Sequence, residues 1–347
     1  MGSDNHPVEQ GTRIFGIEWA PLNVSFKRRM ETFSAFFWFF CVLTGVFVNF
    51  FCLYYILCTA FWPAGILYVV WIYYDRRTAH TGGRPINSIR KFKLWEYFRD
   101  YFPISLIKTA DLPADRNYLF CVYPHGVLAS GAVLNFATDA NKFERLYPGL
   151  QAHLLTLSFN FNLPFSRETI LGLGGCSVAE KSIMNLLGPQ RTGKAGVLVV
   201  GGAAESLKSE PGTYRIVIKN RRGFVRVALK AGAHLVPVIS FGENDMYDQC
   251  RGPTIQKIQN LFHKYLGFVP ILPRGRGFFQ YSFGLVPHRR PINTVVGKAI
   301  TVPRISNPTR EDVDIYHQKF MAEIETLFNE NKGKYDAKGE AAELIME

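Results

Sequence analysis

The stretch "YLFCVYPHG", residues 118–126, contains the pattern that decides the fold of this chain. Its first six residues are apolar or aromatic without alternation, which is typical of a strand covered on both faces of a sheet. Similar runs recur at 152–158, 196–200, 214–219 and 234–242, and helical patterns lie between most of them. Because strands and helices alternate along the chain, we expect an α/β domain with a largely parallel sheet.

Two helices are marked by their ends. The first follows Asn220, a favourable N-cap, and stops at Gly232, with Phe224, Val227 and Ala228 as its buried stripe.

The second predicted helix begins at Thr309, with Asp312 three positions on as in a capping box. We expect this helix to close the domain, and the polar stretch 331–347 to be frayed. Its apolar positions share the helical period and are Val313, Tyr316, Phe320, Ile324 and Leu327.

An apolar segment, residues 32–74, contains no charged side chain. A membrane span needs about 20 residues, so the segment is long enough for two spans or for a helical hairpin. It is too long and begins too late for a cleavable signal peptide. Basic residues on both sides, at 27–29 and 76–77, favour placing both ends in the cytosol. The composition leaves two positions open for the turn, near Asn49 or at residues 63–65.

The net charge is +12 at pH 7, which indicates an anionic partner. Next to an apolar segment, an anionic membrane or substrate fits better than nucleic acid, and the sequence has no zinc-finger spacing and no sustained basic block. The histidines stand apart and no C-x-x-C pair occurs, so we expect no metal site.

Three familiar enzyme signatures are incomplete. Residues 188–195, "GPQRTGKA", end in Ala195 where a P-loop needs a hydroxyl, and a strand follows where a helix is required. "GLGGCS" at 172–177 lacks the third glycine of a dinucleotide fingerprint. No G-x-S-x-G nucleophile elbow occurs. The patterns therefore do not indicate an NTPase, a dinucleotide enzyme or a serine hydrolase.

His125 follows the apolar run directly and stands between Pro124 and Gly126. Since α/β sheets place their chemistry where strands end, His125 is a candidate general base. Pro124 and Gly126 are candidates for oxyanion or turn support, because glycine lets the backbone approach a ligand and turn N–H groups stabilise an oxyanion. The residues alone leave a second interpretation open, a histidine that only packs in the core.

Seven blocks follow one another in the order found in a known family. Together, over about residues 20–330, they resemble the membrane-bound acyl-CoA:acylglycerol acyltransferases of the diacylglycerol acyltransferase 2 and monoacylglycerol acyltransferase family. The blocks are "DYFPISLIKTADL" (100–112), "RNYLF" (116–120), "YPHG" (123–126), "VGGAAESL" (200–207), "NRRGFVRVAL" (220–229), "LVPVISFGEND" (235–245) and "GRGFFQYSFGLVPHRRPINTVVGKAI" (275–300).

The resemblance implies transfer of a fatty acyl group from coenzyme A to a glycerolipid hydroxyl. It places His125 on the family's catalytic histidine, which would take the proton of the acceptor hydroxyl as its oxygen attacks the thioester. The implied product is triacylglycerol from diacylglycerol, or diacylglycerol from monoacylglycerol. Acyl-CoA serves as a co-substrate, and no cofactor or covalent enzyme intermediate is needed.

One position departs from the family pattern. The family reads His-Pro-His-Gly where this chain has Tyr123 before Pro124 and His125. A phenol there could donate a hydrogen bond, and it raises the hypothesis of an altered activity or acceptor. Two alternative functions follow: acylation of long-chain or retinyl alcohols, and a catalytically silent scaffold at a membrane or lipid droplet.

Glu205 is the candidate partner of His125. Soluble glycerolipid acyltransferases orient the histidine with an aspartate four residues later, where this chain has Ala129. Glu205 follows a buried strand and a glycine pair, where a lone carboxylate is costly unless it is paired. The alternative is a glutamate that only interacts favourably with a helix N-terminus.

Arg222, Arg226 and Lys230 recur every four residues and share one face of the helix predicted after Asn220. This basic face is a candidate for contact with coenzyme A phosphates or anionic headgroups, and the alternative is a solvated surface. Arg167 and Glu168, in another family-like block, are expected to form structural ion pairs. The residues predicted to bind acyl-CoA or headgroups are Arg222, Gly223, Phe224, Arg226, Lys230 and Arg276.

The expected location is the endoplasmic reticulum membrane, with the catalytic domain in the cytosol, and also the lipid droplet. The expected partners are acyl-CoA, diacylglycerol or monoacylglycerol, membrane lipids and a second copy of the chain. The predicted parts are a cytosolic tail (1–31), a transmembrane hairpin or two transmembrane helices (32–74), a linker with an amphipathic segment (75–117), an acyltransferase domain (118–330) and a polar C-terminal tail (331–347).

Overall fold

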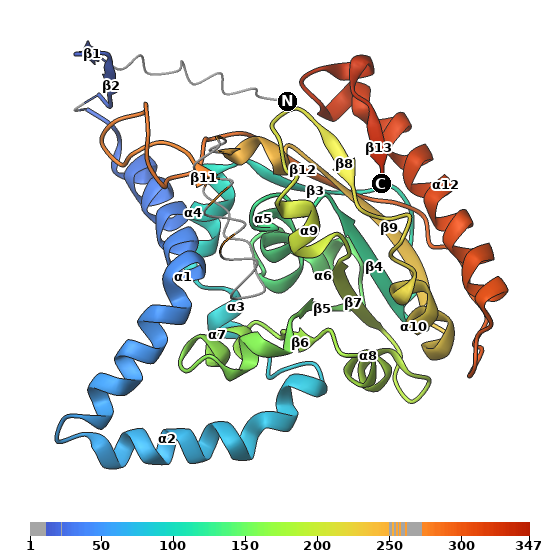
Figure 1. Cartoon of the computed structure of the whole chain (residues 1–347). Coiled ribbons are helices and arrows are strands. Elements are labelled where there is room, and N and C mark those ends of the chain that lie inside the picture. The colour runs from blue at the N-terminus through green and yellow to red at the C-terminus, as the bar shows by residue number, and fades with distance from the viewer. Residues whose placement is uncertain are drawn as a thin grey trace.

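A seven-stranded sheet forms the centre of the structure, in the order β3-β12-β9-β4-β7-β5-β6 (Figure 1). The computed structural model describes residues 12–21, 23–249 and 273–347, together with positions 252, 255, 257 and 261. β12 pairs antiparallel with β9, and the other neighbouring pairs of this sheet are parallel. The expected α/β fold with a central sheet is confirmed. Its strands are β3 Ile104–Lys108, β4 Tyr118–Tyr123, β5 Gln151–Thr156, β6 Cys176–Ser177, β7 Lys194–Val199, β9 His234–Phe241 and β12 Ile292–Val296.

β4 lies in the middle of this sheet, and all six of its residues are buried. Its odd-numbered side chains join the core formed with α8 Glu180–Leu187, α10 Gly223–Ala231 and α12 Arg310–Tyr335. Its even-numbered side chains join a second core with residues 132–147 on the opposite face. The strand is apolar throughout because both of its faces are covered, as its sequence predicted.

The two helices expected from their caps are present. α10 ends at Gly232, whose φ of 71° is the left-handed conformation that glycine adopts readily. Its N-cap is Arg222 rather than Asn220, so this prediction was two residues early. α12 is capped by Thr309 and Asp312, whose side chains each accept a hydrogen bond from the backbone of the other residue.

The C-terminal stretch, expected to be frayed, is ordered against the domain. α12 continues to Tyr335, and β13 Leu344–Met346 pairs in parallel with β8 Tyr214–Ile216. The predicted strand 214–219 is therefore shorter and lies outside the central sheet. The prediction was wrong because Leu344 and Met346 pack against the hydrophobic core beside β8, in addition to the main-chain pairing.

The apolar segment forms two helices, α1 Phe26–Leu57 and α2 Trp62–Tyr74, which meet at a sharp bend (Figure 1). α1 passes through Asn49 without a break, so a turn at that position was wrong. The chain turns at residues 58–61, and Pro63 lies in the first turn of α2, where its missing N–H costs no helical hydrogen bond.

α1 suggests membrane association. Among the helices of the described residues, it alone is long and apolar enough to cross a bilayer. α2 has 13 residues, fewer than the roughly 20 that a complete span needs. Phe47 is 78% exposed and Phe51 is 66% exposed on α1. Aromatic side chains exposed in such a row are unfavourable in water and favourable in lipid.

The predicted linker contributes to the sheet. α4 Lys93–Tyr101 is the expected amphipathic helix, and its buried residues pack against Ala35 and Phe39 of α1. β3 follows it directly and forms one edge of the central sheet. The sheet therefore begins before residue 118, because β3 pairs with β12 from the far end of the chain. Of the predicted N-terminal tail, residues 1–11 lie outside the described residues.

The remaining elements are short. They are β1 Thr12–Ile14, β2 Ile17–Trp19, η1 Asp75–His80, α3 Asn87–Arg90, α5 Ser130–Ala132, η2 Val133–Ala137, α6 Phe143–Leu146, η3 Ser158–Asn162, α7 Ser166–Gly172, α9 Gly202–Ser206, η4 Glu243–Met246, β10 Asp248–Gln249, β11 Pro273–Arg274 and η5 Gly339–Ala341.

A buried ion-pair network fixes α2 and η1 to the domain. Arg167 is fully buried and pairs with Asp75 at 2.9 Å and with Glu168, as predicted for this structural pair. Arg84 adds two hydrogen bonds to the Asp75 carboxylate, each 3.1 Å long. Burial of Asp75 opposes its ionised form, but hydrogen bonds from Thr78, Arg167 and Arg84 outweigh burial and lower its pKa.

We expect Asp75→Ala to destabilise the fold by about 3–5 kcal/mol, because Arg167 would lose a partner in a buried site. The matched control is Asp111→Ala, since the Asp111 side chain is 91% exposed in its pair with Lys108, and about 1 kcal/mol or less is expected there. Thermal or denaturant unfolding of the detergent-solubilised chain measures both. Equal losses in the two variants would contradict a structural role for the buried network.

Candidate active site

Three neighbouring parallel strands deliver the site residues to one edge of the sheet. His125 follows β4, Glu205 and Ser206 lie on α9 after β7, and Glu243 comes after β9. Because parallel strands end at the same edge, residues far apart in sequence meet there. The structure therefore brings His125 and Glu205 together, as expected, and adds Ser206 and Glu243.

The imidazole of His125 is held through Nδ1. Ser206 Oγ lies 2.7 Å from this nitrogen, and the Gly126 carbonyl oxygen lies 3.2 Å from it. Since a carbonyl only accepts, and Ser206 can donate onward to the Gly202 carbonyl at 3.4 Å, the consistent arrangement has the proton on Nδ1. Nε2 then carries the lone pair. Burial lowers the pKa of His125 below 6.5, so this nitrogen is an unprotonated base at pH 7.

Glu205 contacts His125 through the main chain. Its Oε1 accepts the His125 N–H at 2.6 Å, and its Oε2 accepts the Val217 N–H at 3.2 Å. The carboxylate therefore anchors the backbone of the turn, and its expected contact with the imidazole is not made. Burial raises the pKa of Glu205 to about 7. The hydrogen bonds from the His125 and Val217 N–H groups favour the charged form and lower the pKa, but burial is the larger effect. A side chain at Gly201 would overlap this carboxylate, so only glycine fits there.

Ser206 makes the contact that was expected of Glu205. It is buried and bonds the imidazole directly. The sequence carried a signal for it, since Ser206 follows Glu205 at the end of a predicted strand. The distinction between the two depends on which side of the short helix α9 faces His125, and the short block "GGAAES" does not specify that.

Glu243 is a second buried carboxylate, which the sequence reasoning missed. Its Oε1 accepts the Ser130 N–H at 2.6 Å and its Oε2 accepts the Gly131 N–H at 3.0 Å. It is fully buried, and burial raises its pKa to about 8 despite these hydrogen bonds. Its position directly after the predicted strand 234–242 was the available signal. Residues 125–131 are thus held by a carboxylate at each end.

Gly126 lies between these anchors with a φ of 60°. A Cβ there would lie 2.8 Å from the Glu243 carbonyl oxygen, so a larger residue would be both strained and crowded. The Gly126 N–H makes no hydrogen bond within the described part of the chain. Its predicted role as an oxyanion donor stays a prediction. Pro124 has no N–H and so cannot donate to an oxyanion, which leaves turn support as its predicted role.

Tyr123 is buried with its ring near Phe320, 6.4 Å between centroids. Its hydroxyl has no hydrogen-bond partner among the described residues. The hydrogen bond predicted for this phenol is therefore not made there, and burial, the largest cause, raises its pKa well above the ordinary value.

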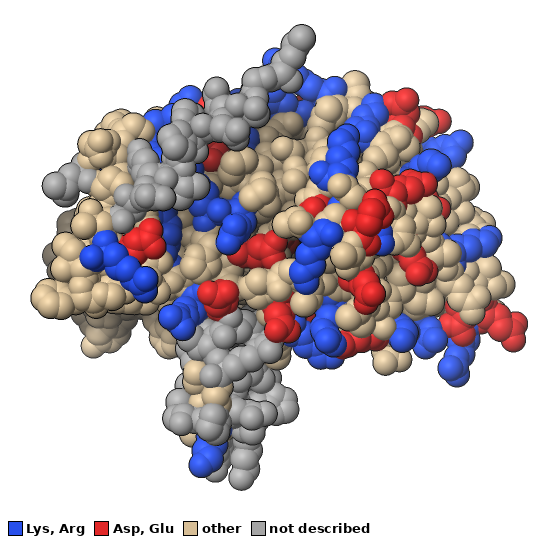
Figure 2. Space-filling model, turned by 90° about the horizontal axis from the view of Figure 1, so that it is seen from above, with Lys and Arg blue, Asp and Glu red and all other residues tan. Residues whose placement is uncertain are grey.

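The predicted basic face is largely neutralised by acidic neighbours. Arg222 pairs with Asp314 at 2.7 Å, and Lys230 pairs with Glu180 at 2.6 Å. Figure 2 shows acidic side chains interspersed with basic ones over the face seen from above.

The three remaining residues of that predicted set on α10 differ in exposure, and Arg226 is exposed. Phe224 belongs to the core, where its ring meets Phe320 at 5.0 Å, so it is not free to contact a ligand. Gly223 has open space around it. Arg276 lies elsewhere, beside the start of α1, in a cavity described below. Among the described residues, no group of three His, Cys, Asp or Glu side chains is placed to hold a metal ion.

Comparison with known proteins gives consistent matches. The family model described as diacylglycerol acyltransferase matches residues 54–347. A 2-acylglycerol O-acyltransferase 1 from Bos taurus is 41% identical, over 92% of this chain and 96% of the relative. Diacylglycerol O-acyltransferase 2 from Homo sapiens is 41% identical over 93% of this chain and 84% of the relative. Diacylglycerol O-acyltransferase 2 from Danio rerio is 47% identical over 81% of this chain and 79% of the relative.

A solved structure, the 1-acyl-sn-glycerophosphate acyltransferase PlsC from Thermotoga maritima, has a TM-score of 0.39 and 14% sequence identity. The likeness covers 87% of this chain and 98% of that one, and it is too distant to carry an argument about the site.

The Glu243→Gln variant tests the raised pKa of this carboxyl. A carboxyl with a pKa above its ordinary 4.5 in the folded chain stabilises the fold fully below pH 4.5, and this contribution is lost as the pH rises to about 8. The amide does not titrate. We therefore expect the wild type to lose stability relative to Glu243→Gln between pH 4.5 and 8, measured as thermal unfolding in detergent at a series of pH values.

The control for this experiment is Glu144→Gln, at an exposed position on α6, which should change the unfolding temperature little at any pH. A difference between wild type and Glu243→Gln that stays constant from pH 4.5 to 8 would show that Glu243 keeps an ordinary pKa.

Proposed function

Because this chain belongs to the diacylglycerol acyltransferase family, we propose that it is an acyl-CoA-dependent O-acyltransferase in which His125 is the general base. Its relatives are named for diacylglycerol and for 2-acylglycerol, and this chain acylates the free hydroxyl of such acylglycerols. The single observation that supports the base is the hydrogen bonding of His125 Nδ1, which leaves Nε2 unprotonated.

The proposed reaction is a direct transfer. Nε2 of His125 takes the proton from the acceptor hydroxyl as that oxygen attacks the thioester carbonyl carbon. The carbonyl oxygen becomes an oxyanion, towards which the free Gly126 N–H would donate. The C–S bond then breaks, and the imidazolium returns its proton to the coenzyme A thiolate. The products are the new ester and free coenzyme A, and no covalent enzyme intermediate forms.

Positioning in this proposal comes from three side chains. Ser206 fixes the imidazole, Glu205 fixes the backbone of His125, and Glu243 fixes the far end of the same turn. A general base contributes only where its lone pair meets the reacting proton, so rigid support of this turn matters for the rate. Glu205 is thus a positioning residue.

The membrane supplies the acceptor in this proposal. α1 would lie in the bilayer, with the basic residues at 27–29 and 76–77 at its cytosolic surface. Diacylglycerol and monoacylglycerol dissolve in that bilayer, and acyl-CoA reaches it from the cytosol. These features support an endoplasmic reticulum membrane location with the catalytic sheet on the cytosolic side, and movement to lipid droplets remains part of the same proposal.

We expect His125→Ala to lower acyl transfer by about 10²–10⁴-fold, because it removes the general base. The assay uses membranes containing the full chain, labelled oleoyl-CoA and a panel of acceptors: diacylglycerol, monoacylglycerol, a long-chain alcohol and retinol. The acceptor that gives the fastest turnover identifies the preferred substrate. A chain that transfers to none of them would be the silent scaffold considered above.

The matched control for this variant is His80→Ala. His80 also bonds a serine through Nδ1, at 2.6 Å to Ser182 Oγ, but it lies in η1, which packs against α8 and β6. Its loss should leave turnover close to wild type. If His125→Ala retained wild-type turnover, the proposed base would be wrong while the family assignment would stand.

The pH dependence of kcat/KM gives an independent test. Because burial lowers the pKa of His125, the imidazole stays neutral down to a pH below 6.5 and loses its basic form only beneath it. The acidic limb of the profile should therefore have its midpoint below pH 6.5 in membranes assayed with saturating acceptor. A midpoint clearly above 6.5 would indicate another group as the base.

A further inference from the structure

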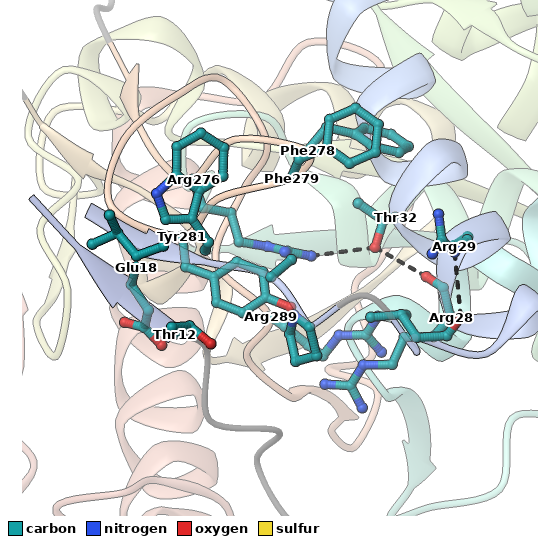
Figure 3. A pocket seen from close by; sticks show the side chains of 15 residues that line it. Thr12, Glu18, Arg28, Arg29, Thr32, Arg276, Phe278, Phe279, Tyr281 and Arg289 are labelled. Atoms are coloured by element: carbon teal, nitrogen blue, oxygen red, sulfur yellow. Dashed lines mark hydrogen bonds between the residues drawn. The ribbon is translucent and has the colours of Figure 1, made fainter.

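A cavity of about 700 Å³ lies beside the start of α1 (Figure 3). Three segments line it: the β1–β2 region and the first turns of α1, which follow each other in the sequence, and residues 276–289, which are distant from both. Main-chain hydrogen bonds connect two of these segments, from Ala20 to Phe279 at 2.9 Å and from Tyr281 to Glu18 at 2.7 Å. Hydrogen-bonded main chain therefore joins two of the segments that line the cavity.

Among the described residues, four arginines line this cavity, against a single carboxylate, Glu18. We call Arg28, Arg29, Arg276 and Arg289 the arginine pocket. Arg289 pairs with Glu31 at 2.6 Å, and its Nη2 is buried without a hydrogen-bond partner among the described residues.

Arg276 is the best-placed cation of the arginine pocket. It forms no ion pair with a carboxylate in the described ranges. Its guanidinium is held by the Tyr101 hydroxyl at 3.0 Å and by Thr32 Oγ1 at 3.3 Å. It also lies over the rings of Tyr101 and Tyr281, with centroid distances of 5.5 and 4.9 Å. Neutral partners fix its position while leaving its charge uncompensated, which is the arrangement that binds an anion.

Apolar side chains complete the walls. Trp19, Val24, Phe278 and Phe279 lie around the arginines, and the lining continues along α1 to Thr32, where the apolar segment begins. A ligand that satisfied this cavity would combine an anionic group with an apolar or aromatic part. The cavity lies at the basic start of α1. If α1 enters a membrane, this is the depth at which the phosphate headgroups of the lipids lie.

The arginine pocket opens on the same edge of the sheet as His125. Tyr101 lies just before β3, and Arg289 lies just before β12. Both strands run antiparallel to β9, whereas β4 runs parallel to it. β3 and β12 therefore begin at the edge of the sheet where β4 and β9 end. Three strand spacings separate β3 from β4, which is roughly 14 Å. Tyr101, which holds Arg276, and Arg289 therefore lie at the edge of the sheet that also presents His125.

We propose that the arginine pocket binds the phosphate group of an amphiphilic ligand at the membrane surface. Arginine guanidinium groups match phosphate oxygens in geometry and charge, and the aromatic walls take the rest of the molecule. Two sources have this chemistry: an anionic phospholipid of the membrane, and the phosphates of acyl-CoA. The second source rests on the proposed acyl-CoA-dependent function, whereas the first does not.

The test measures binding by the full chain in nanodiscs, without turnover. The variants are Arg28→Gln and Arg276→Gln, and the matched control is Arg13→Gln, which removes the same charge from an exposed site on β1 that does not line the cavity. The probes are a non-reactive thioether analogue of acyl-CoA, its dephosphorylated form, inorganic phosphate as a competitor, and nanodiscs of phosphatidylcholine with or without phosphatidylserine.

Each pocket variant should weaken binding by roughly tenfold or more, the effect of losing one charge-assisted hydrogen bond, while the control stays near wild type. A loss confined to the phosphorylated analogue identifies acyl-CoA as the source. A loss of the preference for phosphatidylserine, seen as weaker labelling by a photoreactive analogue of that lipid, identifies the phospholipid.

Wild-type affinity for every probe in both variants, with unchanged unfolding temperatures, would overturn the proposal. His125→Ala should bind all probes as wild type does. A binding result that contradicts the arginine pocket can therefore be told apart from a turnover result that contradicts His125 as the base.

Discussion

The parallel pairing of β4 with β7 on one side and β9 on the other is the constraint on which the rest of the structure depends. It aligns Val122 with Val199 and Val238, so the three chain segments leave the sheet side by side. His125, the Glu205–Ser206 pair and Glu243 then fall within contact of one turn. No local interaction along the sequence could bring them together, because about 80 and 113 residues separate the partners of the main-chain hydrogen bonds.

The two buried carboxylates show how this edge is stabilised. An isolated carboxylate in the core is costly, and burial raises the pKa of both Glu205 and Glu243. Each recovers part of that cost by accepting two main-chain N–H groups that would otherwise be buried without a partner. The turn therefore has little freedom to rearrange without leaving a donor and an acceptor unpaired at once. This rigidity is useful for a base and is gained at the expense of stability at neutral pH.

Much of the sheet could be predicted from the sequence, and the reason is physical. A strand covered on both faces must be apolar, so 118–123 and 234–242 were evident, and Gly232 and Thr309 marked helix ends through their caps. The sequence of a strand does not show which other strand it pairs with. β8 was predicted as a strand, but its partner is the short strand Leu344–Met346 within the otherwise polar C-terminal stretch, and β3 lay in the predicted linker.

For the candidate site, too, some features could be predicted from the sequence and others could not. His125 and Glu205 were predictable because both follow predicted strands, and Glu243 had the same signal. The atom that Glu205 contacts was not predictable, since that depends on the orientation of the five-residue helix α9. Ser206, one residue on, reaches the imidazole while Glu205 reaches the backbone. A constellation read from sequence therefore identifies the residues of a site better than it assigns contacts among them.

The path of the chain from α1 to the sheet joins membrane attachment to the candidate active site. α1 packs on α4 through aromatic contacts, Trp38 with Trp95 at 5.8 Å and Phe39 with Phe98 at 6.3 Å. α4 leads directly into β3, which begins at the edge where β4 ends. α1, the helix that suggests membrane association, is thus connected through a layer of aromatic contacts to the edge that presents His125. In the proposed function, an acceptor dissolved in a bilayer and a thioester arriving from water would meet at this edge, and the position of α1 relative to the sheet would then set where they meet.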